Sequence, residues 1–305
     1  MRERWFLLGC LVVMGAGWGA TLPLSKIAVS GDYRHVGVIF WQLLIGAVAM
    51  GAIQFARGRK LRLDRRALGI FVLIACIGTL FPNAASFEAL LKLPACLFSI
   101  LISMVPILAF PVALVMRNEN FAWLRVFGLG MGLVGVILIV GPDASLPERA
   151  MVVFVPLALI APSFYALEGN IVAKWGTDGM DGIEVLFGAS FFGAILAFPL
   201  TLMTGTFINP LPPWGAPDFA IALSSILHVT VYAAYVWLVG RAGPIFAAQV
   251  AYLVTGFGVF WSMLVLGERY SIWVWFAMVV ILSGVFLVQP RLREPLAETA
   301  ETRQS

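Results

Sequence analysis

The sequence predicts an all-α integral membrane protein with ten transmembrane helices arranged as two inverted five-helix repeats. Of its 305 residues, 61% are hydrophobic and 12% are charged. A soluble domain averages about 45–50% apolar and about 25% charged residues. Because the apolar excess runs along the whole chain, a soluble enzyme of this composition would have nowhere to bury its apolar surface. Soluble protein classes are therefore excluded.

Ten apolar stretches are each close to the roughly 20 residues that a membrane-spanning helix requires. They cover residues 5–29, 35–56, 67–90, 94–116, 122–141, 151–173, 182–204, 217–239, 244–267 and 271–289. Runs such as 124–140 are apolar on all sides, whereas the strands of a membrane β-barrel alternate. The spans leave too little chain for a soluble catalytic domain.

The basic residues predict how these spans are oriented. The linker after the second span carries Arg57, Arg59, Lys60, Arg62, Arg65 and Arg66. Lys and Arg accumulate in cytoplasmic loops, so this linker is expected to face the cytoplasm. With ten spans both termini then also face the cytoplasm, as expected for a multi-pass protein of the cell inner membrane. The positive charge therefore indicates topology and contact with membrane lipids, and no nucleic acid partner is expected.

Metal and cofactor sites have no sequence support. The three cysteines, Cys10, Cys76 and Cys96, lie inside apolar spans and predict no disulfide framework. The two histidines lie far apart in the sequence, so no metal cluster is visible. No phosphate-binding loop of the GxxxxGK type is present either. Neither a cofactor nor ATP-driven pumping is expected.

Two glycine patterns have structural explanations. Residues 130–135 read GxGxxG, but they follow no strand and lie inside a span, so they do not predict a nucleotide site. Gly128 and Gly132 form a GxxxG pair, and Gly15 and Gly19 form another. Such pairs allow two helices to approach closely, and we interpret both as packing sites.

The two halves of the chain share a pattern of residues. Trp18-Gly19 precedes Lys26 by eight residues, and Tyr165-Ala166 precedes Lys174 by nine; Pro94 precedes Glu119 by 25, and Pro244 precedes Glu268 by 24. We therefore predict repeats at residues 1–145 and 146–290, followed by a polar cytoplasmic tail at 291–305. Because five spans is an odd number, the second repeat is inverted, a frequent plan among secondary transporters.

These residues resemble the EamA-type, ten-helix members of the drug/metabolite transporter superfamily. The resemblance covers roughly residues 5–290 and rests on Trp18-Gly19 with Lys26, Phe87 to Leu90 running into Leu93-Pro94-Ala95, Pro106, Glu119, and Gly267-Glu268-Arg269. It implies a carrier, commonly an exporter of amino acids or other small organic metabolites. Many members have an arginine in the second span where this chain has Trp41-Gln42.

The eighth span has the clearest polar stripe. Ser225, His228, Tyr232 and Tyr235 are spaced by three, four and three residues, which places them on one helical face. A histidine changes charge near neutral pH, as a proton-coupled carrier requires. The alternative is a neutral His228 that forms a hydrogen bond to a neighbouring helix.

The sixth span contributes Tyr165 and Glu168 on one face. A carboxylate at this depth is expected to be protonated, paired or hydrated. It either contacts the substrate or forms an ion pair or inner gate with Lys174. Pro156 and Pro162 are expected to interrupt or kink this span.

Further candidates lie in three other spans. Trp18 is central in the first span, and Lys26 near its outer end either extends to the membrane surface or pairs with Glu88 as an outer gate. Asn83 in the third span, with Gln249 and Tyr252 in the ninth, adds amide and hydroxyl groups. Together with the aromatic residues they predict a cavity for a small amphipathic organic solute.

The sequence thus predicts a secondary transporter, an exporter of an amino acid or related small organic solute, working by alternating access. An uncoupled facilitator of the same solutes is the first alternative. An integral membrane enzyme is the second, but the chain lacks HExxH, GxSxG and a pair of mid-span aspartates. A purely structural membrane protein would not need Glu168 and His228 at depth.

Overall fold

The structure, a computed structural model, describes residues 2–288 except 32, 143–145, 147, 244–245 and 248. The predicted tail at 291–305 and Pro244 lie outside these described residues. Helices account for all the regular structure in the described chain, and no strand occurs there. The all-helical class predicted from composition is therefore confirmed for this part of the protein.

The helices follow one another with short connections. They are α1 (Arg2–Val29), α2 (His35–Ala56), α3 (Arg65–Ile74), the π-helix η1 (Ala75–Leu80), α4 (Phe81–Lys92), α5 (Ala95–Ile102), α6 (Val105–Val115), α7 (Trp123–Val140), the 3₁₀-helix η2 (Arg149–Phe154), α8 (Val155–Trp175), α9 (Gly182–Met203), α10 (Ala216–Ala242), α12 (Val250–Leu266) and α13 (Ile272–Val288). Eight continuous stretches are long and apolar enough to cross a membrane, and α12 and α13 are shorter apolar helices.

Local signals fix several helix ends. Asp64 accepts a hydrogen bond from the backbone N–H of Ala67 and begins α3, and Asp181 accepts one from Glu184 and begins α9. Gly267 ends α12 with a φ of 65°, a left-handed conformation that glycine adopts without a steric penalty. These ends match the predicted spans to within a few residues.

The two prolines of the sixth span affect its helix differently. Pro156 lies in the first turn of α8, and Pro162 lies inside this helix, which is continuous from Val155 to Trp175. A proline in the first turn removes no helical hydrogen bond. The predicted interruption is not observed at Pro162, whereas the span changes from the 3₁₀-helix η2 to α8 just before Pro156, and a kink stays a prediction. The irregular segments are instead the π-helix η1 and the turn at Ser103–Met104 between α5 and α6.

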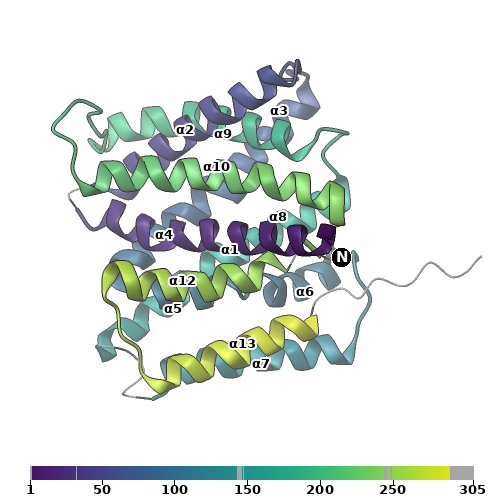
Figure 1. Ribbon diagram of the computed structural model, residues 1–305, viewed down its shortest axis with the longest axis vertical. Coiled ribbons are helices and arrows are strands. Elements are labelled where there is room, and N and C mark those ends of the chain that lie inside the picture. The colour runs from purple at the N-terminus through teal and green to yellow at the C-terminus, as the bar shows by residue number, and fades with distance from the viewer. Residues whose placement is uncertain are drawn as a thin grey trace, which may run out of the picture.

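Helices from one half of the chain pack mainly on helices from the other half. In Figure 1, α2 and α9 lie side by side at one end of the molecule, and α7 and α13 lie together at the other. Between these pairs, α1 packs on α10 and α12, and α8 packs on α4 and α6. The first helical stretch of each half thus packs on the third and fourth stretches of the other half.

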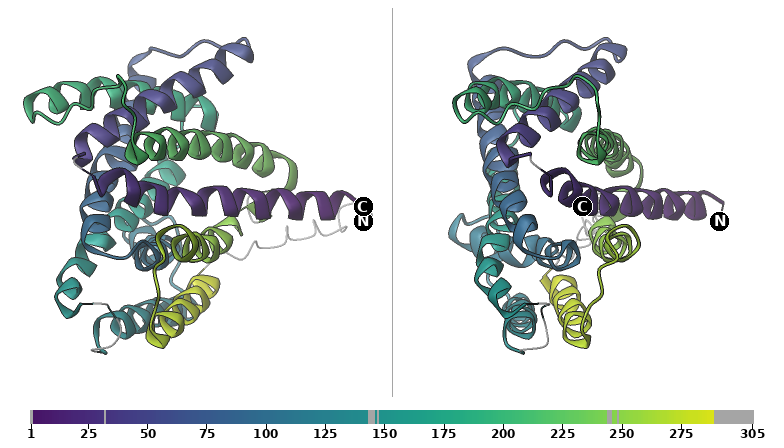
Figure 2. Two further views of the ribbon diagram at one scale, coloured as in Figure 1. Left: turned by 60° about the vertical axis from the view of Figure 1, so that its left-hand side comes forward. Right: turned by 90° about the vertical axis from the view of Figure 1, so that its left-hand side faces the viewer.

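Both views in Figure 2 keep α7 and α13 together at the edge. To describe the site we divide the other helices into two groups, and α2 of group one packs on α9 of group two across this division. Group one contains α1, α2, α10 and α12; group two contains α3, η1, α4, α5, α6, α8 and α9. Helix α5 lies at the centre of the largest apolar cluster, and every residue from Ala95 to Leu101 is buried. It packs on α12 of group one and on α8 of group two.

Both GxxxG pairs lie where helices approach closely. A Cβ on Gly15 would be 2.4 Å from the Cβ of Leu253, and one on Gly128 would be 2.7 Å from the carbonyl oxygen of Gly284. Helices α1 and α12, and α7 and α13, therefore pack at distances that only a missing side chain allows. The prediction that these glycines serve packing is confirmed.

Candidate functional site

Helix α10 exposes two different faces. One is an apolar stripe formed by Phe219, Leu223, Ile226 and Trp237, which are all exposed. His228 follows Phe219 by nine residues, two and a half turns of a helix with 3.6 residues per turn, so it projects from the opposite side. His228 is exposed as well, although its face is directed at other helices. Its exposure indicates an accessible space inside the bundle.

The side chain opposite His228 is Trp18 of α1. The Trp18 ring lies 6.0 Å from the His228 ring and 5.5 Å from that of Tyr235, between ring centroids, and His228 stacks on Tyr232 at 6.4 Å. The Nε1 atom of Trp18 is buried and has no hydrogen-bond partner among the described residues. His228 likewise has ring contacts but no hydrogen bond within the described chain, so the predicted alternative of a hydrogen-bonded histidine is not observed. These residues form an aromatic wall on group one.

Group two contributes a polar wall. The Tyr165 hydroxyl donates a hydrogen bond to Oδ1 of Asn83 across 3.0 Å. One turn further along α8, the carboxylate of Glu168 lies over Gly78, where an added Cβ would be 2.6 Å from Oε1. Gly78 belongs to η1, and π-helical turns occur frequently at functional sites. The absent side chain at Gly78 leaves room for the Glu168 carboxylate.

Glu168 belongs to the polar wall, because it lies one turn after Tyr165 on the same face of α8. Six of the predicted site residues thus fall into two sets of contacts: Trp18, His228 and Tyr232 on α1 and α10, and Asn83, Tyr165 and Glu168 on α4 and α8. We call these six, with Gly78 and Tyr235, the central site.

The other two predicted lining residues lie apart from these contacts. Gln249 is exposed just before the first residue of α12, and its side chain makes no hydrogen bond within the described chain. The Tyr252 hydroxyl is buried without a hydrogen-bond partner among the described residues, and its ring packs against the large apolar cluster around α5. Neither makes a ring contact or hydrogen bond with the central site.

At the end of the bundle opposite the arginine-rich linker, one turn is held from both sides. Lys26 donates to the carbonyl oxygens of Leu90 and Leu93, at 3.0 and 2.5 Å. Glu268 accepts a hydrogen bond from the backbone N–H of Ala95 at 2.9 Å, and others from Cys96 and the Tyr270 hydroxyl. A lysine and a glutamate from group one thereby secure the turn between α4 and α5 of group two.

The predicted gate pair at this end does not form. The Glu88 carboxylate lies 2.7 Å from Nδ1 of His35, the first residue of α2, whereas Lys26 is occupied by the carbonyl groups described above. Lys26 and Glu88 therefore make separate contacts. Each of these contacts joins group one to group two.

At the arginine-rich end, the α2–α3 linker is bound to the loop before α9. Arg57 and Arg59 contact the Asp181 carboxylate at 2.5 and 2.6 Å, and Arg62 contacts Asp178 at 2.8 Å. Partial burial acts to raise the pKa of Asp181. Hydrogen bonds from Arg57 and from the Glu184 N–H, with the arginine charges, outweigh burial and hold this pKa below its ordinary value.

Lys174, which occupies the place of Lys26 in the second half, makes a different contact. Its ammonium group donates to the Met116 carbonyl at 2.8 Å, and nearby Asn118 donates to the Asn170 side chain at 3.1 Å. These contacts lie within group two. Glu168 has no ion pair with Lys174 or with any other described residue, so the predicted ion-pair alternative is not observed.

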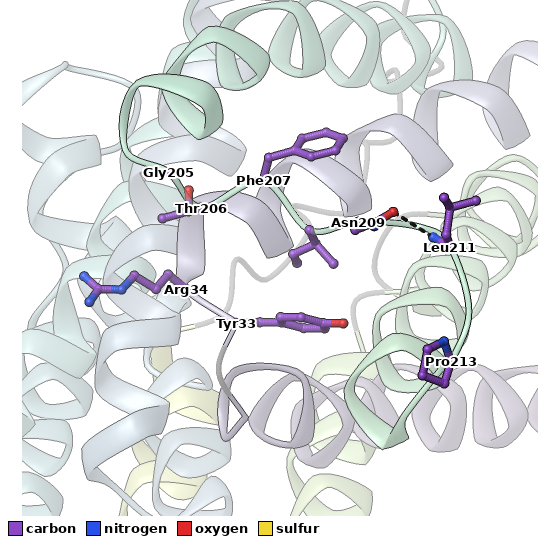
Figure 3. Close-up of a pocket in the computed structure, with 9 residues that line it drawn as sticks. Tyr33, Arg34, Gly205, Thr206, Phe207, Asn209, Leu211 and Pro213 are labelled. Atoms are coloured by element: carbon purple, nitrogen blue, oxygen red, sulfur yellow. Dashed lines mark hydrogen bonds between the residues drawn. The ribbon is translucent and has the colours of Figure 1, made fainter.

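A cavity of about 340 Å³ lies at the end opposite the arginine-rich linker, between residues 33–34 and the loop before α10 (Figure 3). Its lining includes Tyr33, Arg34, Thr206 and Asn209. The Tyr33 hydroxyl donates to Asp218 at 2.6 Å, which raises the pKa of Tyr33 to about 12. None of its lining residues belongs to the central site, so this cavity is separate from it.

Sequence reasoning missed the functional placement of three residues. Gly78 had no signal, because nothing in the sequence indicates that a neighbouring carboxylate occupies its side-chain space. His35 begins a span and gives no sign of its contact with Glu88. Glu268 was marked by the repeat with Glu119, and this spacing was the available signal for its place beside the α4–α5 turn.

Comparisons with known proteins agree with this architecture. The chain matches the model of the EamA-like transporter family in two segments, residues 4–141 and 153–289. It is 27% identical over 296 residues to the uncharacterized transporter YvbV of Bacillus subtilis (strain 168), covering 93% of this chain and 91% of that protein. A solved structure described as "Crystal structure of protein" aligns with a TM-score of 0.61 at 16% identity, covering 91% of this chain and 94% of that one, and supports the fold alone.

Proposed function

Because this chain belongs to the EamA-like transporter family, we propose that it is a secondary carrier that exports a small organic metabolite, an amino acid or a related solute. It works by alternating access in the cell inner membrane, with the linker at 57–66 and both termini in the cytoplasm. The six described basic residues of this linker face one end of the bundle, in keeping with the charge bias of cytoplasmic loops.

In this proposal, residues 1–145 and 146–290 form two inverted repeats of five spans, and α12 and α13 supply the last two crossings. The exchange of packing partners supports this division. Helices α1 and α8 pack on corresponding helices of the opposite half, and the pairs α2–α9 and α7–α13 each join corresponding helices. A two-fold relation between inverted halves would produce this pattern, and in carriers built this way the substrate site lies at the interface of the halves.

The observation that carries the proposal is the exposure of His228 on the interior face of α10. An apolar protein core has no reason to keep a histidine accessible there, whereas a transport pathway requires accessible polar groups at depth. The central site surrounds this position with rings from α1 and α10 and with polar groups from η1, α4 and α8. Its aromatic and hydroxyl groups suit a small organic solute better than a bare inorganic ion. We also include Gln249 and Tyr252 in this pathway, because they lie at the start of α12, which packs on α1.

Polar contacts between the two groups at the ends of the bundle suggest where gates would lie. Opposite the arginine-rich end, Lys26, Glu268 and Glu88 each bind across the boundary between the two groups. At the arginine-rich end, Arg57 and Arg59 bind Asp181 at the start of α9, also across this boundary, whereas Lys174 binds within group two. In this proposal Lys26 and Glu88 act as separate parts of a closed outer gate, and rocking of the groups releases and re-forms such contacts.

The test is flux into proteoliposomes. Purified protein is offered a mixed panel of amino acids, nucleosides, amines and sugar phosphates, with and without an imposed pH gradient. Selective flux of one class, enhanced by the gradient, is the expected result. Selective flux that ignores the gradient would identify an uncoupled facilitator instead. No flux of any solute by folded protein would overturn the transport proposal for these solutes.

Variants in α10 connect the flux to the central site. His228→Ala and Tyr232→Ala are each expected to reduce flux at least tenfold, because both remove rings from the aromatic wall. The matched control is Ile226→Ala, on the lipid-facing stripe of the same helix. Unchanged flux in both central-site variants would show that the pathway lies elsewhere.

A further inference from the structure

The arginine-rich linker between α2 and α3 contains two kinds of basic residue. Arg57 and Arg59 bind the Asp181 carboxylate of the α8–α9 loop, and Arg62 binds the Asp178 carboxylate of the same loop. These three side chains hold the linker against the rest of the protein. Their charges are compensated by acidic groups of the chain itself.

The other three basic residues of the linker are Lys60, Arg65 and Arg66, and we call them the free basic set. The side chains of Lys60 and Arg65 are exposed and form no ion pair or hydrogen bond within the described chain. Arg66 lies 3.8 Å from Asp178, a carboxylate that Arg62 already binds at 2.8 Å, and its side chain is 84% exposed. Three cationic groups are therefore available to an anion from outside the chain.

Exposed apolar side chains place the free basic set at the level of the lipid headgroups. Phe55, in the last turn of α2, is 85% exposed, and Leu63, two residues before Arg65, is 64% exposed. Val72 and Leu73, about two turns further along α3, are exposed as well. Exposed apolar side chains of a membrane-spanning helix contact acyl chains, and long basic side chains beside them reach the membrane surface.

Helix α3 lies at the periphery of the molecule. In Figure 1 it belongs to the end that α2 and α9 form, and it packs on α9. Its buried residues, Ala67, Phe71 and Ile74, form a single face. Arg65 and Arg66 occupy its first turn and are exposed. The free basic set is therefore directed at the surroundings of the protein and not at the interior of the bundle.

We propose that the free basic set is a binding surface for anionic phospholipids. Its three cations contact the phosphate group, and the exposed Phe55 and Leu63 contact the acyl chains. Lysine and arginine bind phosphate oxygens through charge-assisted hydrogen bonds, and basic clusters next to a spanning helix attract anionic lipids. A zwitterionic lipid presents the same phosphate together with an ammonium group, which the basic side chains repel. The surface is separate from the central site and does not depend on the solute.

The test measures lipid selectivity by native mass spectrometry of the purified full chain in detergent. Phosphatidylglycerol and phosphatidylcholine with identical acyl chains are offered at equal concentrations. Bound phosphatidylglycerol is expected to exceed bound phosphatidylcholine about tenfold, because each exposed basic residue adds attraction to an anionic headgroup. Raising the salt concentration is expected to reduce this excess by screening. Equal binding of the two lipids at low salt would overturn the proposal.

Variants then locate the surface. The linker variant removes the free basic set by three substitutions: Lys60→Gln, Arg65→Gln and Arg66→Gln. The matched control removes three exposed basic residues at the opposite end of the bundle: Arg34→Gln, Lys92→Gln and Arg269→Gln. The linker variant is expected to lose most of the excess, and the control is expected to keep it. Unchanged selectivity of folded linker variant, or an equal loss in both variants, would contradict the assignment; thermal unfolding verifies folding.

A competition experiment separates a lipid from a soluble phosphate compound. Glycerol 1-phosphate carries a phosphate and a glycerol group but no acyl chains, and it is added in large excess to protein with bound phosphatidylglycerol. The lipid is expected to stay bound, because Phe55 and Leu63 add apolar contacts that the competitor does not make. Complete displacement would identify a site for soluble phosphate compounds and overturn the assignment to lipid.

Discussion

Lys26 and Glu268 come from nearly opposite ends of the chain and hold the two sides of one turn. Lys26 binds the carbonyl groups that end α4, and Glu268 binds the N–H groups that begin α5. Free carbonyls at a helix end attract a cation, and free N–H groups at a helix start attract an anion. The turn between α4 and α5 is therefore fixed by charges of the sign that each helix end prefers.

Replacing Glu268 with alanine is expected to destabilise the protein by about 1–3 kcal/mol, because the N–H groups of Ala95 and Cys96 and the Tyr270 hydroxyl lose their acceptor. Thermal unfolding in detergent measures the change. Arg269→Ala, at an exposed neighbouring position, is the control and is expected to leave the midpoint nearly unchanged. Equal effects of the two variants would mean that Glu268 does not stabilise the turn.

Adding one methyl group to Gly128 is expected to cost about 1–3 kcal/mol, because the new Cβ would lie 2.7 Å from the Gly284 carbonyl oxygen of α13. The same change at Gly130, two residues along α7, meets no atom within 4 Å. Comparing the unfolding midpoints of Gly128→Ala and Gly130→Ala therefore isolates helix packing from helix propensity. The packing interpretation fails if Gly130→Ala is the more destabilised of the two.

Gly78→Ala is expected to reduce transport at least tenfold, since the new methyl group would occupy the space of the Glu168 carboxylate. Gly69→Ala, in the same helical stretch, is the matched control because its Cβ meets nothing within 4 Å. Initial rates in proteoliposomes give the comparison. Full activity of Gly78→Ala would show that the position of Glu168 over η1 is unimportant.

The ion pairs of Asp181 predict a pH dependence of stability. Since its pKa in the folded protein lies below the ordinary value of about 3.9, its contribution is present above that pH and is lost as the pH falls through the folded pKa. Asp181→Asn is therefore expected to lower the unfolding midpoint at pH 6, with the difference from wild type shrinking below about pH 4.

The control for this series is Glu148→Gln, which removes one exposed negative charge away from the arginine-rich linker. Unfolding midpoints measured from pH 3 to pH 7 compare the two variants. A difference between Asp181→Asn and wild type that grows as the pH falls would refute the expected sign.

Periodicity explains what was predictable. The spacing of Ser225, His228, Tyr232 and Tyr235 fixes their common face in any helix. In the structure Trp18 packs against two of them, His228 and Tyr235, and Tyr232 stacks on His228. The depth of Glu168 likewise follows from its position in an apolar run. The all-helical class, the positions of the spans and the shared face of the α10 residues thus follow from helical spacing and from the length of the apolar runs.

Pairing between distant segments was not predictable in the same way. Both Lys26 and Glu88 were expected near one end, but their partners depend on how α1, α2 and α4 pack. Two backbone carbonyls are better placed for Lys26, and His35 is better placed for Glu88. The π-helix η1 was missed for another reason: Gly78 lies within it and Pro82 follows it, and these local signals were not used.

The central claim is that His228 faces an accessible space inside the bundle, open to one side of the membrane at a time. Cysteine labelling tests it most directly, in protein whose native residues Cys10, Cys76 and Cys96 are replaced. His228→Cys and Ile226→Cys are treated with a membrane-impermeant maleimide in right-side-out and inside-out vesicles. The account predicts labelling of His228→Cys from the cytoplasmic side and none of Ile226→Cys. Labelling of neither variant from either side, or equal labelling of His228→Cys from both sides, would contradict it.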